Sequence, residues 1–451
     1  MFDAASLALL GPALQRVSEG HASLPALTTS PQPAADPAAL AAVLQQVATR
    51  LQDNYPYAHP LYAGQMLKPP HPVARLAYAL ASFVNPNNHA LDGGRASSAM
   101  EREAVAAIAA MFGWTQHLGH LTGGGTMANT EALWVADQLH PGRTIVASTQ
   151  AHYTHARLTQ VLKIPFRTVA QDARARMDLE ALEATLAQGD VGTVVVTLGT
   201  TAAGAVDPLP QILRLRDRHG FRIHVDAAYG GYHRLAGNLG HEARAAFDAI
   251  GEADSIVVDP HKHGLQPYGC GCVLFKDPSV GRFYKHDSPY TYFSSKELHL
   301  GEISLECSRA GASAVALWAT LQLFPLQRGG AFAQGLEAGR EAALDLHRLL
   351  QADARFLTGP APELDIVVWA PRGASASEIS ARSQAIFDAA AQDDLHLAVA
   401  QFPKSMFAHW PIDWDRDHVA CLRSCLMKPE HRDWIAEIWR RLGRATDAVL
   451  S

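Results

Sequence analysis

The sequence predicts an α/β protein built on a mainly parallel central sheet, followed by a smaller C-terminal domain. Between about residues 120 and 275, short apolar runs alternate with helical patterns such as 178–188 and 208–219. That alternation is typical of a parallel sheet covered by helices on both faces. Near Phe324-Pro325 the pattern breaks, and another helix and a strand at 364–369 follow. We therefore expect three parts, with an N-terminal arm and helices at 1–85, a large domain at 86–325 and a small C-terminal α+β domain at 326–451.

Capping signals predict the first helices. Residues 18–37 are rich in Pro, Ser, Ala and Thr and predict an extended arm. Asp36-Pro37 then predicts a helix to about Leu51, with Asp as the cap and Pro in the first turn. Ser98 and Glu101 have capping-box spacing, which predicts a second helix that runs to Phe112 and ends at a glycine.

Composition indicates a soluble protein. The chain has 451 residues, 48% hydrophobic and 18% charged, with a net charge of −6, so nothing suggests nucleic acid or an anionic membrane surface as a partner. The five cysteines show no zinc-binding spacing, so we expect no metal. Their odd number suggests reduced thiols. Without a long apolar run or signal peptide, we expect a cytoplasmic location and no membrane association.

Lys262 is the most informative single residue. It follows the apolar run 255–258 in the segment DPHKHG, between His261 and His263. Burial and cationic neighbours both favour the neutral amine of a lysine, and only the neutral amine forms a Schiff base. This position therefore indicates an aldehyde cofactor, for which pyridoxal phosphate is the leading candidate. A solvated surface lysine is the ordinary alternative for such a residue.

Asp226 supplies the second part of that chemistry. The strand-like run 221–225 ends in Asp226, followed by Ala227 and Ala228. A carboxylate at a strand end can pair with the ring nitrogen of pyridoxal phosphate and keep it protonated. The two alanines leave room for a flat ring. Capping of the next segment is the alternative role for Asp226.

A glycine triplet supplies a candidate phosphate site. Gly123, Gly124 and Gly125 precede Thr126 and a predicted helix at 128–136. Glycines let the backbone approach an anion, and a helix N-terminus favours negative charge. The spacing matches neither the dinucleotide nor the nucleoside-triphosphate motif, and a plain loop is the alternative.

Two further strand ends carry polar side chains. The run 144–148 leads to His152, whose imidazole could stack on a cofactor ring or serve a structural role. The run 194–198 leads to Thr200 and Thr201, whose hydroxyls can bond a cofactor group or lie in a turn.

Taken together, these motifs resemble the group II pyridoxal-phosphate-dependent amino-acid decarboxylases, from about His59 to Phe324. The branch most similar to this chain is that of the bacterial tyrosine and aromatic-amino-acid decarboxylases. The resemblance implies a fold-type I (aspartate-aminotransferase-like) enzyme, a carboxy-lyase that is a homodimer and binds pyridoxal 5'-phosphate. It assigns the Schiff base to Lys262, stacking to His152 and the ring nitrogen to Asp226. The remaining cofactor contacts it implies are Gly125, Thr126, Thr201, Ala228, Asp259 and His261.

The resemblance also implies a tyrosine that protonates the substrate's α-carbon. Tyr290 lies where the family has a mobile catalytic loop, with Tyr292 as an alternate. Tyr268, six residues after Lys262, is a second candidate. Simple packing is the other role open to each tyrosine.

Substrate choice is less determined. His59 and Tyr57 lie in the family's N-terminal "His-Pro" region, which borders the substrate pocket, and His89 lies in another loop. Arg309 could orient the substrate, or form a structural ion pair with Glu306 or a neighbour. We expect a small amino-acid substrate, most simply an aromatic one such as tyrosine, while acidic and aliphatic amino acids stay open.

Other reactions fit the same scaffold. A carbon–carbon lyase, a decarboxylative aldehyde synthase and a transaminase all use this cofactor, and retention of Tyr290 argues against the oxidative one. A non-catalytic scaffold that binds pyridoxal phosphate is the alternative outside enzymes.

Overall fold

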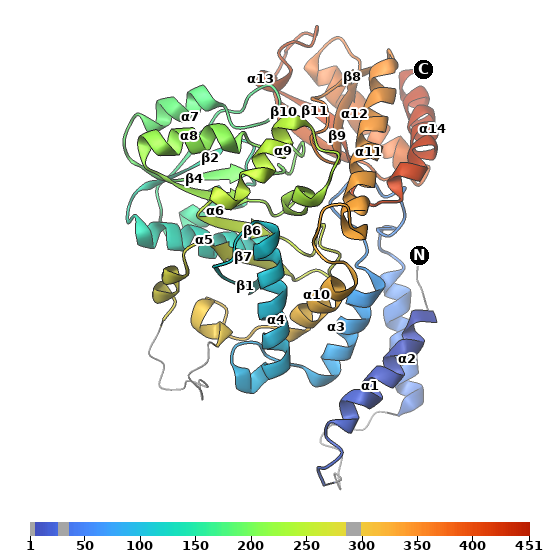
Figure 1. The fold of residues 1–451 in the computed structure, drawn as a ribbon. Coiled ribbons are helices and arrows are strands. Elements are labelled where there is room, and N and C mark those ends of the chain that lie inside the picture. The colour runs from blue at the N-terminus through green and yellow to red at the C-terminus, as the bar shows by residue number, and fades with distance from the viewer. Residues whose placement is uncertain (1–4, 26–35, 286–298) are drawn as a thin grey trace.

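The computed structural model describes residues 5–25, 36–285 and 299–451 (Figure 1). Its large sheet has the strand order β1-β7-β6-β5-β4-β2-β3. β7 is antiparallel to both neighbours, and the other pairs are parallel. This confirms the predicted α/β fold with a mainly parallel sheet. The strands are β1 Leu118–Thr122, β2 Thr144–Ser148, β3 Phe166–Val169, β4 Val191–Thr197, β5 Arg222–Asp226, β6 Ser255–Val258 and β7 Gly271–Phe275.

The large sheet is buried on both faces because alternate side chains of its strands enter different clusters. Val194 and Val196 of β4 pack on one face with α4, α7, α8 and α9. Val195 packs on the opposite face with α5 and α6. The continuous apolar runs in the sequence follow from this burial. The helices of this region are α3 Pro72–Val84, α4 Leu91–Met111, α5 Gly125–Leu139, α6 Thr154–Leu162, α7 Leu179–Leu186, α8 Leu209–His219, α9 His241–Asp248 and α10 Gly311–Leu323.

A four-stranded antiparallel sheet, β10-β11-β9-β8, forms the C-terminal part. Trp369 and Val367 of β9 face the core formed with α11, α12 and α14. Val368 faces the other way, into a cluster that includes Ala205 of the large-sheet region. The domain boundaries stay a prediction. The elements are α11 Ala331–Ala352, β8 Phe356–Thr358, β9 Ile366–Pro371, α12 Ala376–Gln392, β10 Ala398–Pro403, α13 Lys404–Phe407, β11 His418–Cys425 and α14 His431–Leu450.

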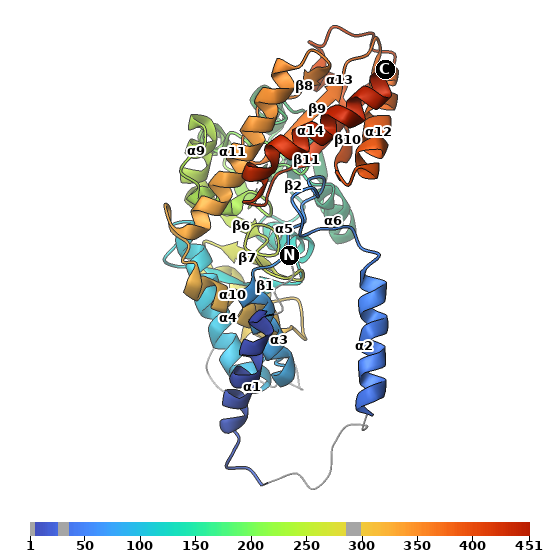
Figure 2. The ribbon, with the colours of Figure 1, turned by 90° about the vertical axis from the view of Figure 1, so that its right-hand side faces the viewer.

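The N-terminal helices are α1 (Leu10–Glu19) and α2 (Pro37–Leu51). Asp36 caps α2 as predicted, since Ala39 N donates to Asp36 Oδ2 at 3.1 Å. Figure 2 shows α2 standing apart from the rest of the chain. None of its residues is buried, although it carries several large apolar side chains.

The prediction of a capping box formed by Ser98 and Glu101 is wrong. α4 begins at Leu91 and has a non-helical kink at Gly94, and Ser98 lies inside the helix beyond this kink. The side chains of Ser98 and Glu101 are both buried. Glu101 accepts hydrogen bonds from Asn88 Nδ2 and Leu121 N and pairs with Arg309. Tertiary contacts therefore use the carboxylate that the spacing assigned to a cap. Within the described residues, no helix is both long and apolar enough to cross a membrane.

Candidate active site

A cavity of about 600 Å³ lies at the carboxyl ends of the parallel strands. Loops after β1, β2, β4, β5 and β6 line it, as expected for this sheet architecture. Every cofactor contact predicted from the sequence lines this cavity. Those residues are Gly125, Thr126, His152, Thr201, Asp226, Ala228, Asp259, His261 and Lys262.

Lys262 lies just past the end of β6 and is mostly buried. Its Nζ lies 3.1 Å from Asp259 Oδ2. Its charged partner is therefore a carboxylate, rather than the flanking histidines that the sequence suggested. His261 Nδ1 donates to Cys270 O at 2.7 Å, and burial, with the charge of Lys262, holds the pKa of His261 below its usual value against the opposing charge of Asp259.

Asp226, at the end of β5, is buried and bonded to a histidine that the sequence did not single out. His155 Nε2 donates to Asp226 Oδ2 at 2.8 Å, and Ala228 N donates to Oδ1 at 3.1 Å. Burial acts to raise the pKa of Asp226, but the hydrogen bond from His155 and the nearby charge of Lys262 outweigh it. The pKa of Asp226 is therefore lowered, and the carboxylate keeps its charge inside the protein.

The glycine triplet meets the N-terminus of α5, which begins at Gly125. Gly124 has a φ of +147°, a conformation that strongly favours glycine. A Cβ at Gly125 would lie 2.7 Å from Asp259 Oδ2, so only glycine lets the loop approach the segment before Lys262 this closely. The first amide groups of a fifteen-residue helix therefore face the cavity beside Thr126.

His152 enters the cavity from the segment between β2 and α6. Thr154 N donates to its Nδ1 at 3.3 Å, which orients the ring. Burial lowers the pKa of His152, so the imidazole is neutral near pH 7. A neutral flat ring beside Asp226 is suited to stacking on an aromatic cofactor.

Arg423 of β11 is a second residue that the sequence did not reveal. It is buried, and its guanidinium donates to the carbonyls of Thr201 at 2.7 Å, Ala202 at 3.1 Å and Gly64 at 3.2 Å. The small sheet thereby fixes the loop that carries Thr201 into the cavity.

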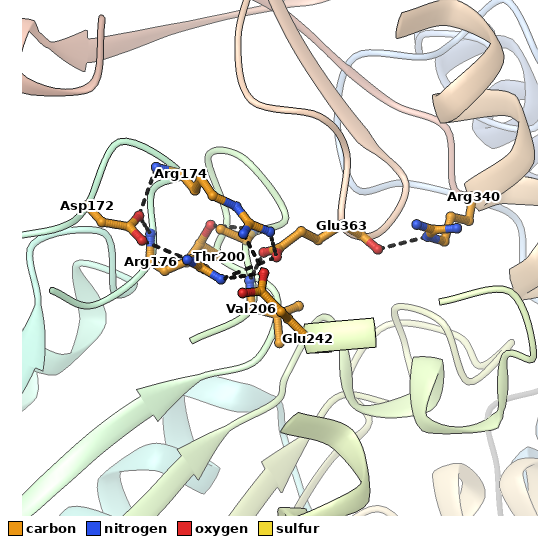
Figure 3. Close-up of polar contacts among 9 residues, drawn as sticks. Asp172, Arg174, Arg176, Thr200, Val206, Glu242, Arg340 and Glu363 are labelled. Atoms are coloured by element: carbon orange, nitrogen blue, oxygen red, sulfur yellow. Dashed lines mark hydrogen bonds and ion pairs between the residues drawn. The ribbon is translucent and has the colours of Figure 1, made fainter. Parts of the chain in front are cut away.

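Glu363, in the loop between β8 and β9, holds the other end of that loop (Figure 3). Val206 N donates to Glu363 Oε2 at 2.7 Å, and Arg174 Nη2 donates to Oε1 at 2.7 Å. Arg174 also pairs with Glu242, as does Arg176 at 3.0 Å. We call Arg174, Arg176, Glu242 and Glu363 the junction cluster.

The predicted substrate contacts lie elsewhere. Of the described residues, the cavity lining does not include His59, Tyr57, His89 or Arg309. His59 packs edge-on against Trp434, with the two ring centroids 4.7 Å apart, and it lines a separate surface pocket. Tyr57 packs against Tyr62 at 5.0 Å.

Arg309 and His89 have structural surroundings. Arg309 is buried and pairs with Glu101, so the structural alternative for this residue is favoured, with a different partner from Glu306. Gly301 N donates to His89 O at 2.8 Å.

Tyr268 lines the cavity, whereas Tyr290 and Tyr292 lie outside the described residues. The Tyr268 ring lies 4.8 Å from that of His261, and its Oη donates to Met66 O at 3.1 Å. Tyr268 is 56% exposed, and the partial burial of its phenol, with the charge of Asp259, raises the pKa of this group, so it keeps its proton at neutral pH.

These residues fit pyridoxal phosphate. Gly125 and Thr126 offer a helix N-terminus for the phosphate, Asp226 an ionised carboxylate for the ring nitrogen, and Lys262 an amine for the aldehyde. The small side chain of Ala228 leaves space between them. The cavity volume is within the range of small-molecule sites.

Comparison with known proteins agrees with this chemistry. Residues 133–370 match the pyridoxal-dependent decarboxylase conserved domain. An L-tyrosine decarboxylase of Enterococcus faecium is 29% identical over 416 residues, covering 68% of this chain and 67% of that protein. A probable L-tyrosine/L-aspartate decarboxylase of Methanocella arvoryzae is 32% identical over 275 residues, covering 60% and 69%.

The fold agrees as well. The Oryza sativa TDC solved with PLP and tryptamine superposes with a TM-score of 0.79, covering 100% of this chain and 99% of that one at 17% identity. Because the family domain matches more than half of this chain, the chain belongs to the pyridoxal-dependent decarboxylases and is a pyridoxal-phosphate-dependent carboxy-lyase.

Proposed function

We propose that this amino-acid decarboxylase acts on an aromatic L-amino acid such as tyrosine and releases carbon dioxide and the corresponding amine. The observation that carries the proposal is the composition of the cavity lining. Among the described residues, the lining contains Tyr268, Tyr229 and Met127 but no arginine, and Lys262 is its one lysine. A buried acidic side chain needs a dedicated cation, and this lining offers none beyond the lysine assigned to the cofactor. An aromatic side chain needs apolar and ring contacts instead.

The roles of the lining residues follow from their contacts. The bound cofactor supplies a protonated ring that accepts the electron pair left behind when carbon dioxide departs. Asp226 holds the proton on the ring nitrogen, and His155 keeps Asp226 ionised and oriented. Lys262 presents the amine to which we assign the cofactor aldehyde. The amides of Gly125 and Thr126 would hold the phosphate, and the His152 imidazole would stack on the ring.

Tyr268 is the described candidate for the proton donor to the α-carbon. Its hydroxyl donates to Met66 O at 3.1 Å, and with a pKa raised above the ordinary value of a phenol it stays protonated at neutral pH. A positioned acid of this kind contributes about 10²-fold to 10⁴-fold to a rate. Tyr290 keeps the same role as a prediction from the sequence.

We infer further that two copies of the chain associate and that α2 takes part. α2 exposes a row of large apolar side chains at helical spacing. An apolar row of this size is normally covered in a stable protein. The row consists of Leu40, Val43, Leu44, Val47 and Leu51. Light scattering on the purified protein measures the mass directly, and a monomer at micromolar concentration would contradict association.

The proposed reaction is tested by carbon dioxide release from the purified holoenzyme. Each proteinogenic amino acid and dihydroxyphenylalanine is assayed with the wild type and with Lys262→Ala. Lys276→Ala is the matched control, because Lys276 is partly exposed and bonds to Gly251 O, away from the cavity. We expect release from tyrosine or another aromatic amino acid, abolished in Lys262→Ala and retained in Lys276→Ala.

Two results would contradict the proposal in different ways. Release from aspartate or an aliphatic amino acid alone would leave the decarboxylase chemistry intact and refute the aromatic pocket. Aldehyde and hydrogen peroxide in place of amine would refute simple decarboxylation and point to the oxidative alternative.

A further inference from the structure

Three buried side chains lie close together in the fold, and one of them belongs to the residue that follows Lys262. His263 is the next residue in the chain, His233 lies in the 3₁₀ turn after β5 (Gly231–Leu235), and Asp365 immediately precedes β9. Each side chain is at most 1% exposed. The cluster therefore joins the segment that carries Lys262 to the C-terminal sheet.

The distances in this cluster suit a shared ion better than hydrogen bonds. Asp365 Oδ2 lies 3.3 Å from His263 Nε2 and 3.7 Å from His233 Nε2. Good N–H···O hydrogen bonds are shorter, at about 2.7–3.2 Å. Ligand atoms of a tetrahedral metal site, each about 2.0–2.1 Å from the ion, are about 3.3 Å from one another.

The Nε2 atoms of His233 and His263 make no hydrogen bond that would compete with a metal ion. Both Nε2 atoms are buried without a hydrogen-bond partner. A buried nitrogen left without a partner destabilises the folded state, so a protein rarely keeps two of them side by side. All three potential ligand atoms lie within 4.8 Å of one another, and ring movements of about 1 Å would bring them to bonding distance from one ion.

Tyr229 orients the carboxylate. Its hydroxyl donates to Asp365 Oδ1 at 2.5 Å, which leaves Oδ2 facing the histidines. Partners of this kind, one layer outside the ligands, fix ligand geometry in metal sites. Tyr229 also lines the active-site cavity, so the cluster and the cavity share one wall.

Lys68 is the side chain that would compete with a metal ion for the charge of Asp365. Its charge acts on Asp365 and on both histidines, and burial lowers its pKa to about 8, with Asp365 opposing the shift. No ion pair within 4 Å joins Lys68 to Asp365 in the described structure. The Asp365 carboxylate therefore has no lysine or arginine within ion-pair distance among the described residues.

We propose that His233, His263 and Asp365 form a binding site for a divalent transition-metal ion of the zinc class. Two imidazole nitrogens and one carboxylate oxygen are a zinc donor set, whereas magnesium and calcium take oxygen ligands. The ion ties the C-terminal sheet to the turn after Lys262. The sequence predicted no metal because these ligands have no motif spacing and come together only in the fold.

The test is metal content, which is independent of decarboxylase activity. Untagged holoenzyme is equilibrated with zinc sulfate near pH 8, dialysed, and assayed by mass spectrometry of metals. We expect about one zinc per chain, with the affinity measured by competition against a fluorescent chelator. His263→Gln and Asp365→Asn are each expected to weaken zinc binding on the order of 100-fold, and Tyr229→Phe on the order of 10-fold.

His347→Gln is the matched control, because it removes a buried imidazole on α11 away from the cluster and should leave the zinc content unchanged. Wild-type protein that retains no zinc refutes the site by itself, without any variant. Equal zinc retention by wild type, His263→Gln and Asp365→Asn also refutes it, since the metal would then lie elsewhere. If either variant fails to fold, as judged by circular dichroism, the Tyr229→Phe affinity decides.

Discussion

Asp226 and Glu363 are both mostly buried carboxylates that contact basic side chains, yet the protein sets their pKa values in opposite directions. Asp226 has a dedicated partner in His155, at 2.8 Å. Glu363 shares Arg174 and Arg176 with Glu242, and Arg174 is 44% exposed. Burial dominates at Glu363 and raises its pKa against the hydrogen bond from Val206 and the charge of Arg174.

The difference shows what makes a carboxylate useful for chemistry. At Asp226 the hydrogen bond from His155 and the surrounding charges overcome burial, so the charge is fixed at one position. In the junction cluster the charges are distributed over several partly exposed groups, and solvent screens them. Single changes should therefore have large effects on activity at Asp226 and small effects on stability at the junction.

The largest effect is expected for Asp226→Ala. Without the carboxylate the ring nitrogen loses its proton, and the electron-accepting power of the cofactor falls. We expect kcat for carbon dioxide release to fall by about 10³-fold, which corresponds to about 4 kcal/mol in the barrier. The measurement is single-substrate kinetics, with cofactor absorbance to confirm binding. A kcat within tenfold of wild type would remove Asp226 from the proposed role.

His155→Gln should have a smaller effect with a distinct pH signature. A neutral amide keeps a donor near Asp226 but removes the imidazole whose hydrogen bond lowers the pKa of that carboxyl, so burial acts on the carboxylate with less opposition. A carboxyl with a lowered pKa stays ionised below its ordinary value and is protonated only as the pH falls through the lowered one. In the variant that protonation moves to higher pH.

We therefore expect kcat to fall by about 10-fold to 100-fold, and the acid limb of the kcat/KM profile to move to higher pH. His241→Gln, on the exposed start of α9, serves as the control. A uniform loss of kcat/KM at every pH would indicate that His155 has only a structural role.

Strand ends could be located from the sequence, but partners across the fold could not. Asp226, Lys262 and Thr201 follow buried apolar runs, and parallel strands bring such ends to one edge. His155 and Arg423 have no comparable signal, because one lies in a helix and the other in a strand of the second sheet. At Glu101 the sequence predicted a role that the fold does not use. The local capping pattern is outweighed there by contacts with Arg309 and Asn88.

Glu363→Gln tests the shared charges of the junction cluster. The amide keeps an acceptor for Val206 N, so we expect a loss of about 1 kcal/mol in the free energy of unfolding. A carboxyl with a raised pKa favours the folded state at low pH and loses that advantage as the pH rises through the raised value. The deficit of the variant should therefore be larger near pH 4.5 than near pH 7.

Urea unfolding at the two pH values measures this change. A deficit that grows toward neutral pH would show that Glu363 acts as a fully paired anion and resembles Asp226 after all. Carbon dioxide release by the variant should stay within a few-fold of wild type, because Arg423 still holds the Thr201 loop.

The smallest effect is expected for Arg174→Ala. The guanidinium is 44% exposed, and both Glu242 and Glu363 keep Arg176 nearby, at 3.0 and 4.0 Å. Exposed ion pairs contribute about 0.2–1 kcal/mol, and salt screens them within about 10 Å at moderate ionic strength. We expect a loss of about 0.5 kcal/mol in the free energy of unfolding at low salt, and almost none at high salt. A larger loss that persists at high salt would mean that Arg174 is as dedicated to Glu363 as His155 is to Asp226, and the contrast between the two regions would then fail.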